Sequence, residues 1–294
     1  MSPDSNFEKA VTFIKDAASQ GCSLVVLPEY HLTNWLPDDP NFIHLCSKSQ
    51  KYLDAYCALA KELNINIVPG TIVEIHSGTS GNSTSGVTSE DELHNVAYFI
   101  SNEGKILGQY QKKNLWHPER PHLTSSKHDK HEAFDTPLGK VGMLICWDLA
   151  FPEAFRELIA AGAKIIIIPT FWNLSDCNEA GLKANPRAEA LFLESTLVAR
   201  AFENTAMIVF ANAGGPKGKV TKGSYAGLSQ VAVPFVGAMG KLGEEEGMSV
   251  VEVDMQILED AESNYKVRED MGREDWHYEY SLTRSDGVED KSRL

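Results

Sequence analysis

The most informative candidate for chemistry in this chain is Cys146. It stands in VGMLICWDLAFPEAFREL (residues 141–158), whose first half has the continuous apolar character of a buried strand and whose second half has helical spacing. A thiol at such a junction is held rigidly, and the N-terminus of the following helix would lower its pKa and stabilise an oxyanion. The sequence therefore favours a nucleophile here, with an unreactive packed cysteine as the alternative.

A thiol that attacks a carbonyl also needs a base and a partner for the developing negative charge. Glu29 follows the apolar segment LVVLP, where burial would raise the pKa of its carboxyl. The segment GQYQKKN brings either Lys112 or Lys113 to the same region as a cation. A surface glutamate and a solvated lysine pair are the simpler alternatives.

The remaining clusters of reactive side chains do not match a metal or phosphate site. Four histidines lie close together in sequence, but no two have the i, i+4 spacing of a helical ligand pair. They are His117, His122, His128 and His131. The segment GGPKGKVT is one residue short of a phosphate-binding loop and has Val220 at the position that must hold magnesium. We therefore predict no metal and no cofactor.

Composition excludes several classes of partner. The chain has 294 residues and a net charge of −14, which argues against nucleic acid or an anionic membrane surface as a partner. Its apolar runs are too short to span a bilayer, and no basic-then-apolar leader opens the sequence. The five cysteines form no CxxC pair. A cytoplasmic protein is expected, and the glycosylation sequons at Asn82 and Asn173 are attributed to chance.

The first half of the chain alternates helices and strands. A helix is predicted over 5–23, capped by Ser5 or Asn6 and ended by Gly21. The other elements expected here are a strand over 24–30, a helix over 51–63, a strand over 65–75, a surface loop over 77–92, and a hairpin formed by 94–100 and 105–110.

The second half continues the same alternation. It is expected to contain strands over 140–146, 164–170, 206–215, 224–235 and 249–254, and helices over 151–162 and 185–205 with Pro186 in the first turn, followed by one further helix. This order predicts a layered α/β architecture with mixed sheets and a single domain over 1–294. Residues 264–294 carry Trp276, Tyr278 and Tyr280, and form an expected C-terminal arm for subunit contact.

Four segments together resemble the nitrilase superfamily of carbon–nitrogen hydrolases. They are LVVLPEY, YQKKNLW, GMLICWDLAFPE and ARAFENTAMIVFANAGG, in that order. The resemblance implies a four-layer αββα sandwich with two mixed β-sheets, and a Glu–Lys–Cys triad. It assigns Cys146 as the nucleophile and Glu29 as the general base. The lysine pattern selects Lys112 over Lys113, which agrees with the alternation of a strand.

The resemblance also implies the supporting residues. The backbone N–H of Trp147 would join Lys112 in stabilising the tetrahedral intermediate, and Glu119 would orient the lysine and the substrate; an exposed loop glutamate is the alternative for Glu119. Trp116, Trp147, Trp172 and Asn173 are expected to line the pocket. Subunits of this superfamily pair through two helices on one face, which implies a homodimer or a higher homo-oligomer.

The reaction implied is hydrolysis of a small amide or carbamoyl-amine through a thioester on Cys146, with release of ammonia. Within the superfamily, CWDLAFPE is more similar to amidases and carbamoyl-amine hydrolases, notably the type that acts on carbamoylputrescine. Leu149 and Ala150 stand where N-carbamoyl-amino-acid hydrolases place arginines, which favours a neutral or cationic substrate. Nitrile hydrolysis and a non-catalytic scaffold are the alternatives. The chain also departs from its relatives because no strand precedes the first helix, which predicts an open sheet edge beside 24–27 and a looser Glu29.

Overall fold

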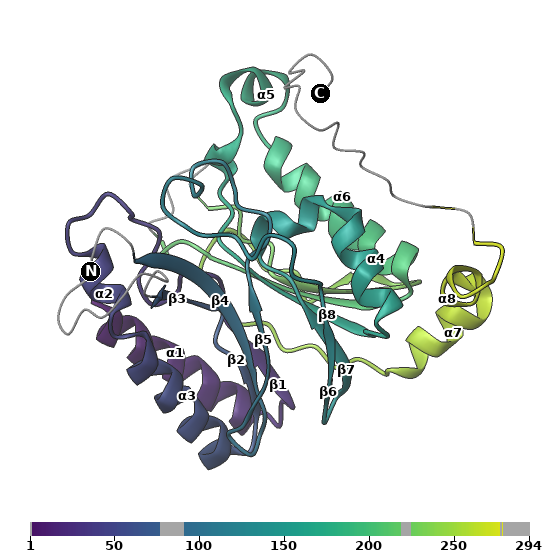
Figure 1. Cartoon of the computed structure of the whole chain (residues 1–294), viewed down its shortest axis with the longest axis horizontal. Coiled ribbons are helices and arrows are strands. Elements are labelled where there is room, and N and C mark those ends of the chain that lie inside the picture. Colours follow the sequence, from purple (N-terminus) through teal and green to yellow (C-terminus); the bar gives the residue numbers. More distant parts are fainter. Residues whose placement is uncertain (1, 77–90, 219–224, 277, 279–294) are drawn as a thin grey trace.

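The protein is a sandwich of two β-sheets with helices on both outer faces. The computed structural model describes residues 2–76, 91–218, 225–276 and 278. Helices α1 (Pro3–Ser19) and α3 (Ser49–Leu63) cover one sheet, and α4 (Pro152–Ala160) and α6 (Ala188–Asn204) cover the other (Figure 1). The predicted four-layer αββα arrangement is confirmed.

The first sheet holds the strands of the N-terminal half. Among the described residues its strands are β1 (Leu24–Val26), β2 (Asn66–Val68), β3 (Thr71–His76), β4 (Glu92–Ile100) and β5 (Ile106–Gln111). β1 runs parallel to β2, whereas β4 is antiparallel to β2, β3 and β5. The predicted hairpin of β4 and β5 is therefore present, and it carries the chain towards Lys112.

The second sheet holds the strands of the C-terminal half. In the described part of the chain these are β6 (Ala133–Thr136), β7 (Gly139–Met143), β8 (Ile165–Thr170), β9 (Met207–Asn212), β10 (Gln230–Val233) and β11 (Gly237–Met239). β7, β8 and β9 are parallel at the centre, and the outer pairings are antiparallel. The parallel strands are apolar on both faces because the other sheet lies on one side and α4 and α6 on the other.

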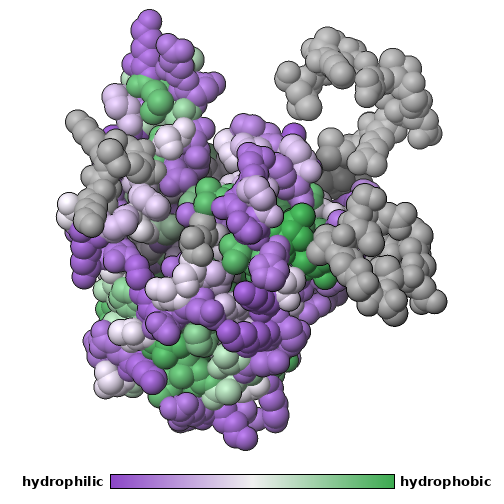
Figure 2. All heavy atoms as spheres, turned by 90° about the vertical axis from the view of Figure 1, so that its left-hand side faces the viewer, coloured by the Kyte–Doolittle hydropathy of each residue, from purple (hydrophilic) through white to green (hydrophobic). Residues whose placement is uncertain are grey.

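Two large apolar cores hold the layers together. The larger one joins the inner faces of both sheets, with Phe99 from the first sheet packed edge-on against Phe134 from the second, and continues to the inner faces of α4 and α6. The smaller one lies between the first sheet and helices α1 and α3, and is centred on Ile14 and Tyr56. The face that carries these two helices is mostly hydrophilic, with apolar residues gathered in limited areas (Figure 2).

Several predicted boundaries differ from the structure. Helix α1 begins at Pro3, and its cap is Ser2, whose hydroxyl accepts a hydrogen bond from the N–H of Ser5, so the prediction of Ser5 or Asn6 as the cap was wrong. Pro186 precedes α6 instead of occupying its first turn. The predicted strand over 65–75 is two strands, because the chain turns at Gly70 with φ of +63°.

The predicted strand over 249–254 is an extended segment with no ladder partner in the described part of the chain. Its side chains still alternate in exposure: Val250 and Glu252 are exposed, and Val251 and Val253 are half-buried. The apolar alternation that suggested a strand is thus real, but no neighbouring strand supplies the hydrogen bonds. Most of the predicted surface loop, 77–90, lies outside the described residues, as does the sequon at Asn82.

The expected open edge beside the first strand is present. Among the described residues β1 pairs only with β2, and Leu24 and Val26 remain half-buried on the side of the inner core. The short α2 (Phe42–Cys46) packs through Phe42 and Cys46 in a small apolar cluster with Val73 of β3.

The predicted C-terminal arm, residues 264–294, starts at the end of α7 (Gln256–Tyr265) and continues through α8 (Val267–Met271), beyond α4 in Figure 1. Arg268 in α8 donates a hydrogen bond of 2.7 Å to the carbonyl of Ala163, in the loop that follows α4. Residues 279–294, including Tyr280, lie outside the described residues. The role of the arm in subunit contact stays a prediction. Within the described residues, no helix is both long enough and apolar enough to cross a membrane.

Candidate active site

Three segments far apart in sequence deliver the predicted site residues to one place between the sheets. Glu29 follows β1, Lys112 directly follows β5, Glu119 lies in the loop after it, and Cys146 begins a five-residue 3-10 helix, Cys146–Ala150, after β7. Lys112 Nζ lies 2.9 Å from Oε1 of Glu29 and 2.7 Å from Oε1 of Glu119. Lys112 is fully buried, and Cys146 is 7% exposed.

Lys113 takes a different position from Lys112. Its backbone N–H donates to the hydroxyl of Tyr110, and its carbonyl accepts a hydrogen bond from Ser125. The positive charge of Lys113 acts on His131, whose pKa is lowered by burial first and by this charge second. The two neighbouring lysines thus separate as the alternation of a strand predicts, and only Lys112 meets Glu29.

Glu29 is fixed from both sheets, although it follows an edge strand. Its Oε1 accepts a hydrogen bond from Asn95 Nδ2 at 2.8 Å, and its Oε2 accepts one from the backbone N–H of Phe171 at 2.9 Å. Its own N–H donates to the carbonyl of Thr170 at 3.3 Å. The open edge of β1 therefore does not leave Glu29 loose. Sequence reasoning missed Asn95, because nothing in the spacing of β4 distinguishes it from a core residue.

Glu119 is buried and fully engaged. Tyr30 Oη donates to its Oε1 at 2.5 Å, and the N–H of Trp116 donates to its Oε2 at 2.8 Å. With Lys112 as the third donor, Glu119 has a defined orientation beside the lysine, so the alternative of an exposed loop glutamate was wrong. Tyr30 directly follows Glu29 in sequence, and this adjacency was the available signal for it.

Cys146 has an unusual backbone conformation. Its φ is +46°, in the left-handed region that residues other than glycine seldom adopt, while Ile145 before it is extended. Such strain persists only where the surroundings determine the conformation, and it is frequent at functional sites. The sharp turn aims the thiol into the space between the sheets, with Sγ 4.0 Å from the carbonyl oxygen of Phe171.

The electrostatic setting of Cys146 differs from the sequence-based expectation. Burial and the negative charge of Glu29 raise the pKa of the thiol well above its usual value, although Lys112 acts in the opposite direction. The helix after Cys146 is a single short 3-10 segment, so its dipole is too small to outweigh burial beside carboxylates. The expected lowering of the pKa was therefore wrong, and the resting thiol is protonated at neutral pH.

The pKa values of Glu29 and Lys112 are both raised. Burial raises the pKa of Glu29 to about 7, an effect that Lys112 opposes and Glu119 reinforces. Burial alone would lower the pKa of Lys112, but the charges of Glu119 and Glu29 outweigh it and hold that pKa well above its usual value. The arrangement provides a carboxyl that exchanges its proton near neutrality beside a permanent cation.

The three predicted pocket tryptophans form one aromatic cluster. The ring centroids of Trp116 and Trp147 are 4.4 Å apart, and those of Trp147 and Trp172 are 5.4 Å apart. Trp172 also stacks on Phe192 at 5.4 Å and donates from Nε1 to Glu189 at 2.6 Å. The sequence did not indicate a role for Phe192 or Glu189. Both lie in α6, where polar and apolar residues alternate without a pattern that marks a site.

The fourth predicted pocket residue, Asn173, is half-buried beside this cluster. Its backbone N–H donates to Oδ2 of Asp176 at 2.9 Å, and burial raises the pKa of Asp176 to about 6. Within the described residues, no hydrogen bond joins Asn173 to Glu29 or Lys112.

Three of the four histidines considered as metal ligands pack on different aromatic rings. His117 packs on Trp116, His122 packs on Trp35, and His131 stacks on Tyr110. In the described part of the chain, no group of three or more His, Cys, Asp or Glu side chains is placed to hold a metal ion.

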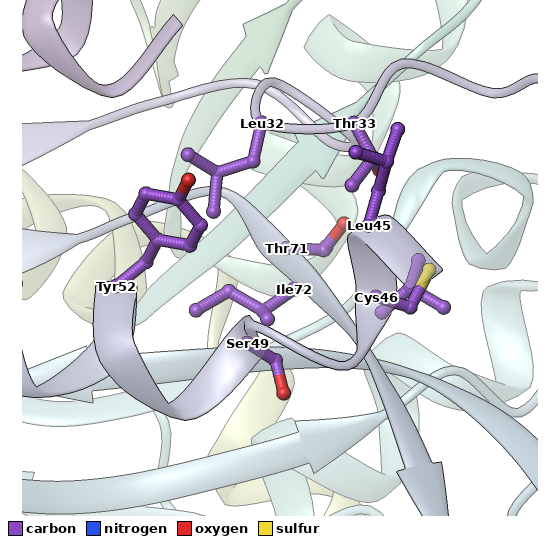
Figure 3. Close-up of a pocket in the computed structure, with 9 residues that line it drawn as sticks. Leu32, Thr33, Leu45, Cys46, Ser49, Tyr52, Thr71 and Ile72 are labelled. Carbon is purple, nitrogen blue, oxygen red and sulfur yellow. The ribbon is translucent and has the colours of Figure 1, made fainter. Parts of the chain in front are cut away.

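A small cavity in the first half of the fold is separate from these residues. It has a volume of about 10 Å³ and lies where α2 and α3 meet β3, as Figure 3 shows, with Leu32, Cys46 and Thr71 among its lining residues. It is large enough for about one water molecule. It therefore has no bearing on a substrate.

Comparison with known proteins agrees with this geometry. The carbon–nitrogen hydrolase family model matches residues 1–262, so the chain belongs to the carbon–nitrogen hydrolase family. Its relatives include amidases: the 2-oxoglutaramate amidase of Bacillus subtilis is 26% identical over 92% of this chain and 93% of its own. The human omega-amidase NIT2 is 26% identical over 86% of this chain and 84% of its own.

Solved structures show the same fold. A carbon–nitrogen hydrolase from Helicobacter pylori matches with a TM-score of 0.77 at 22% identity, over 92% of this chain and 90% of that one. Yeast Nit3, described as a member of branch 10 of the nitrilase superfamily, matches with a TM-score of 0.71 at 23% identity, over 90% and 89%. These likenesses show that the chain has the fold of these proteins.

Proposed function

We propose that the protein hydrolyses a small amide through a thioester on Cys146, with Glu29 as the general base and Lys112 as the stabilising cation. The observation that carries this proposal is the convergence of Lys112 with Glu29 and Glu119 in a buried site beside the strained turn of Cys146. A buried lysine between two carboxylates is costly for stability alone, which favours a functional reason for it.

The proposed reaction begins as Sγ of Cys146 bonds to the amide carbon while Glu29 accepts the thiol proton. Lys112 and the N–H of Trp147, at the start of the 3-10 helix where amide groups lack partners from a preceding turn, stabilise the oxyanion. The C–N bond then breaks, and Glu29 gives its proton to the departing nitrogen, which leaves as ammonia.

The second half of the proposed reaction hydrolyses the thioester. Glu29, again ionised, accepts a proton from water as the water oxygen bonds to the acyl carbon. The C–S bond breaks, the acid leaves, and the thiolate of Cys146 regains a proton from Glu29. Each half transfers one proton to Glu29 and back, which a carboxyl with a pKa near 7 does efficiently at neutral pH.

Intact mass spectrometry tests this scheme. Wild-type protein quenched with acid during turnover of an amide is expected to carry an adduct of the acyl mass on Cys146, whereas the Glu29→Gln variant is expected to show neither adduct nor turnover, because its thiol has lost the base. The Cys146→Ala variant provides the matched control and is expected to show no adduct. Turnover by the Cys146→Ala variant at the wild-type rate would refute Cys146 as the nucleophile. The observed activity would then belong to another site, and the Cys146 site would have only a binding or scaffold role.

We also propose that the substrate body is neutral or cationic. Lys112 is the cation of the site, and its two short ion pairs to Glu29 and Glu119 leave it committed to them. Leu149 is fully buried at the first position where relatives acting on carboxylates place arginine. The aromatic cluster adds the carboxylate of Glu189, which opposes an anionic substrate.

Three amides of similar length test the charge preference. They are butanamide, 4-aminobutanamide and succinamate, which differ in having a neutral, a cationic and an anionic end. We expect ammonia release from the first two at a kcat/KM at least about tenfold above that for succinamate, the scale of one unfavourable charge in a partly buried site. Since 2-oxoglutaramate also carries a carboxylate, a preference for succinamate would contradict this proposal and align the chain with that relative's name.

A carbamoyl-amine and a nitrile complete the panel. Butylurea tests the carbamoyl-amine class: the same attack would release ammonia, and hydrolysis of the resulting thiocarbamate would give butylamine and carbon dioxide. Butanenitrile tests the nearest alternative, because a thiol nucleophile also adds to a nitrile carbon. Conversion of the nitrile to acid faster than the amide would favour a nitrilase instead of an amidase.

The quaternary structure and location form a further part of the proposal. A homodimer or higher homo-oligomer through the outer face of α4 and α6 is proposed from the resemblance, and light scattering after size-exclusion chromatography tests it. A cytoplasmic location is proposed because the five cysteines, all in the described part of the chain, are free.

A further inference from the structure

Asp148 is a fully buried carboxylate that accepts four hydrogen bonds. Its Oδ1 accepts from the backbone N–H of Asn114 at 2.9 Å and from Asn114 Nδ2 at 2.8 Å. Its Oδ2 accepts from Tyr110 Oη at 2.8 Å and from the backbone N–H of Ile145 at 2.9 Å. None of the ion pairs among the described residues includes Asp148. Its negative charge is balanced by oriented N–H and O–H groups alone.

The donors to Asp148 come from both halves of the sandwich. Tyr110 lies in β5 of the first sheet, two residues before Lys112, and Asn114 lies two residues after Lys112. Ile145 immediately precedes Cys146, at the end of the second sheet's β7 segment. One carboxylate therefore fastens both sides of Lys112 to the turn that carries Cys146.

The bonds to Asp148 also determine the strained turn. A carboxylate accepts only along its lone-pair directions, and charge-assisted hydrogen bonds are short and directional. The N–H of Ile145 donates to Oδ2 of Asp148, so this hydrogen bond joins the residues on either side of Cys146. The left-handed φ of +46° at Cys146 persists only if neighbouring contacts of this kind hold it. A shift of this carboxylate would move Lys112 and Cys146 relative to each other.

We propose that Asp148 is the positioning residue that sets the distance between Lys112 and Cys146 across the two sheets. It acts through Tyr110, Asn114 and Ile145 and does not touch the substrate. The inference rests on the proposed function for its catalytic consequence, but the geometric relation of Lys112 to Cys146 is independent of turnover.

The Asp148→Asn variant tests this role, because the amide keeps the shape but turns one acceptor into a donor that faces other donors. We expect kcat to fall about 100-fold, the scale of a 1 Å misplacement, with KM within about threefold of wild type. Tyr110→Phe removes one of the four bonds and is expected to give a smaller fall of about tenfold. The control is Glu157→Gln, an exposed carboxylate on α4 that accepts a hydrogen bond from the N–H of His131; its kcat should stay within twofold.

A second readout separates positioning from general destabilisation. Lys112 lowers the pKa of the Cys146 thiol, so its displacement should raise that pKa and move the pH profile of iodoacetamide alkylation at Cys146 to higher pH. Folded Asp148→Asn protein with an unchanged alkylation profile and unchanged kcat would overturn the inference. If Asp148→Asn does not fold, the alkylation profile is measured in Tyr110→Phe and Asn114→Ala. A shift to higher pH in these variants would support the inference, and an unchanged profile with unchanged kcat would overturn it. If the wild type has no amidase activity, the proposed function fails, while the alkylation profiles still test the role of Asp148.

Discussion

Lys112 Nζ lies 2.9 Å from Oε1 of Glu29, although 83 positions separate the two residues in the chain. Both side chains are buried, and Glu119 completes a carboxylate–ammonium–carboxylate set. Because water is excluded, each charge depends on the others for its stability, and the loss of any one should have large effects.

Substitution of Lys112 by Met is expected to abolish the amidase activity and to destabilise the fold. The two carboxylates would remain buried without a cation, at a cost of about 3–5 kcal/mol in the free energy of unfolding. Urea unfolding monitored by tryptophan fluorescence measures this cost. The control is Lys113→Met, which changes a cation outside the triad and should alter the unfolding free energy by less than about 1 kcal/mol.

The pH dependence of kcat/KM should show a limb with an apparent pKa near 7. Burial raises the pKa of Glu29 to about 7, and the base must be ionised to accept the thiol proton. Glu29 is protonated below this value, so activity should rise about tenfold per pH unit up to pH 7 and reach a plateau above it. Initial rates of ammonia release between pH 5 and 9 measure the limb, and maximal activity at pH 5 would contradict the assignment.

The segment boundaries show what the sequence could predict and what it could not. Apolar periodicity located α1, α3, α4, α6 and most strands of both sheets, but not β6 and β11, and alternation separated Lys112 from Lys113. Asn95 was missed because it contacts Glu29, which is 66 positions away in sequence. Tyr30 was missed because it contacts Glu119, which is 89 positions away. The strand over 249–254 was wrong because pairing is decided by a neighbour and not by the segment itself. The thiol pKa was wrong because burial is a property of the assembled site.

Substitution of Gly70 by Ala is expected to destabilise the protein and to reduce activity. The added Cβ would lie 1.9 Å from the carbonyl oxygen of Pro28, directly before Glu29, and the φ of +63° disfavours alanine. We expect a loss of about 2–4 kcal/mol in the free energy of unfolding. Gly21→Ala is the matched control: its φ is +76°, but the new Cβ meets no atom within 4 Å, so only the backbone strain of about 1 kcal/mol should appear.

Replacement of Cys146 by Gly and by Ala should separate activity from backbone strain. Both variants remove the thiol and are expected to be inactive. Glycine usually destabilises relative to alanine by about 1 kcal/mol, but at a φ of +46° this order should disappear or reverse. Thermal unfolding of the two variants measures the difference. A Gly variant with a Tm clearly below that of the Ala variant would show that the left-handed turn carries no strain.

The complete burial of Lys112 has a consequence for chemical labelling of the protein. Acylating reagents that target primary amines reach solvent-facing lysines such as Lys51 and Lys105 freely, whereas they reach the amine of Lys112 only through the route by which a substrate enters or after a local opening of the fold. The rate at which Lys112 is acylated, relative to Lys51 and Lys105, therefore measures how accessible the buried site is to small molecules.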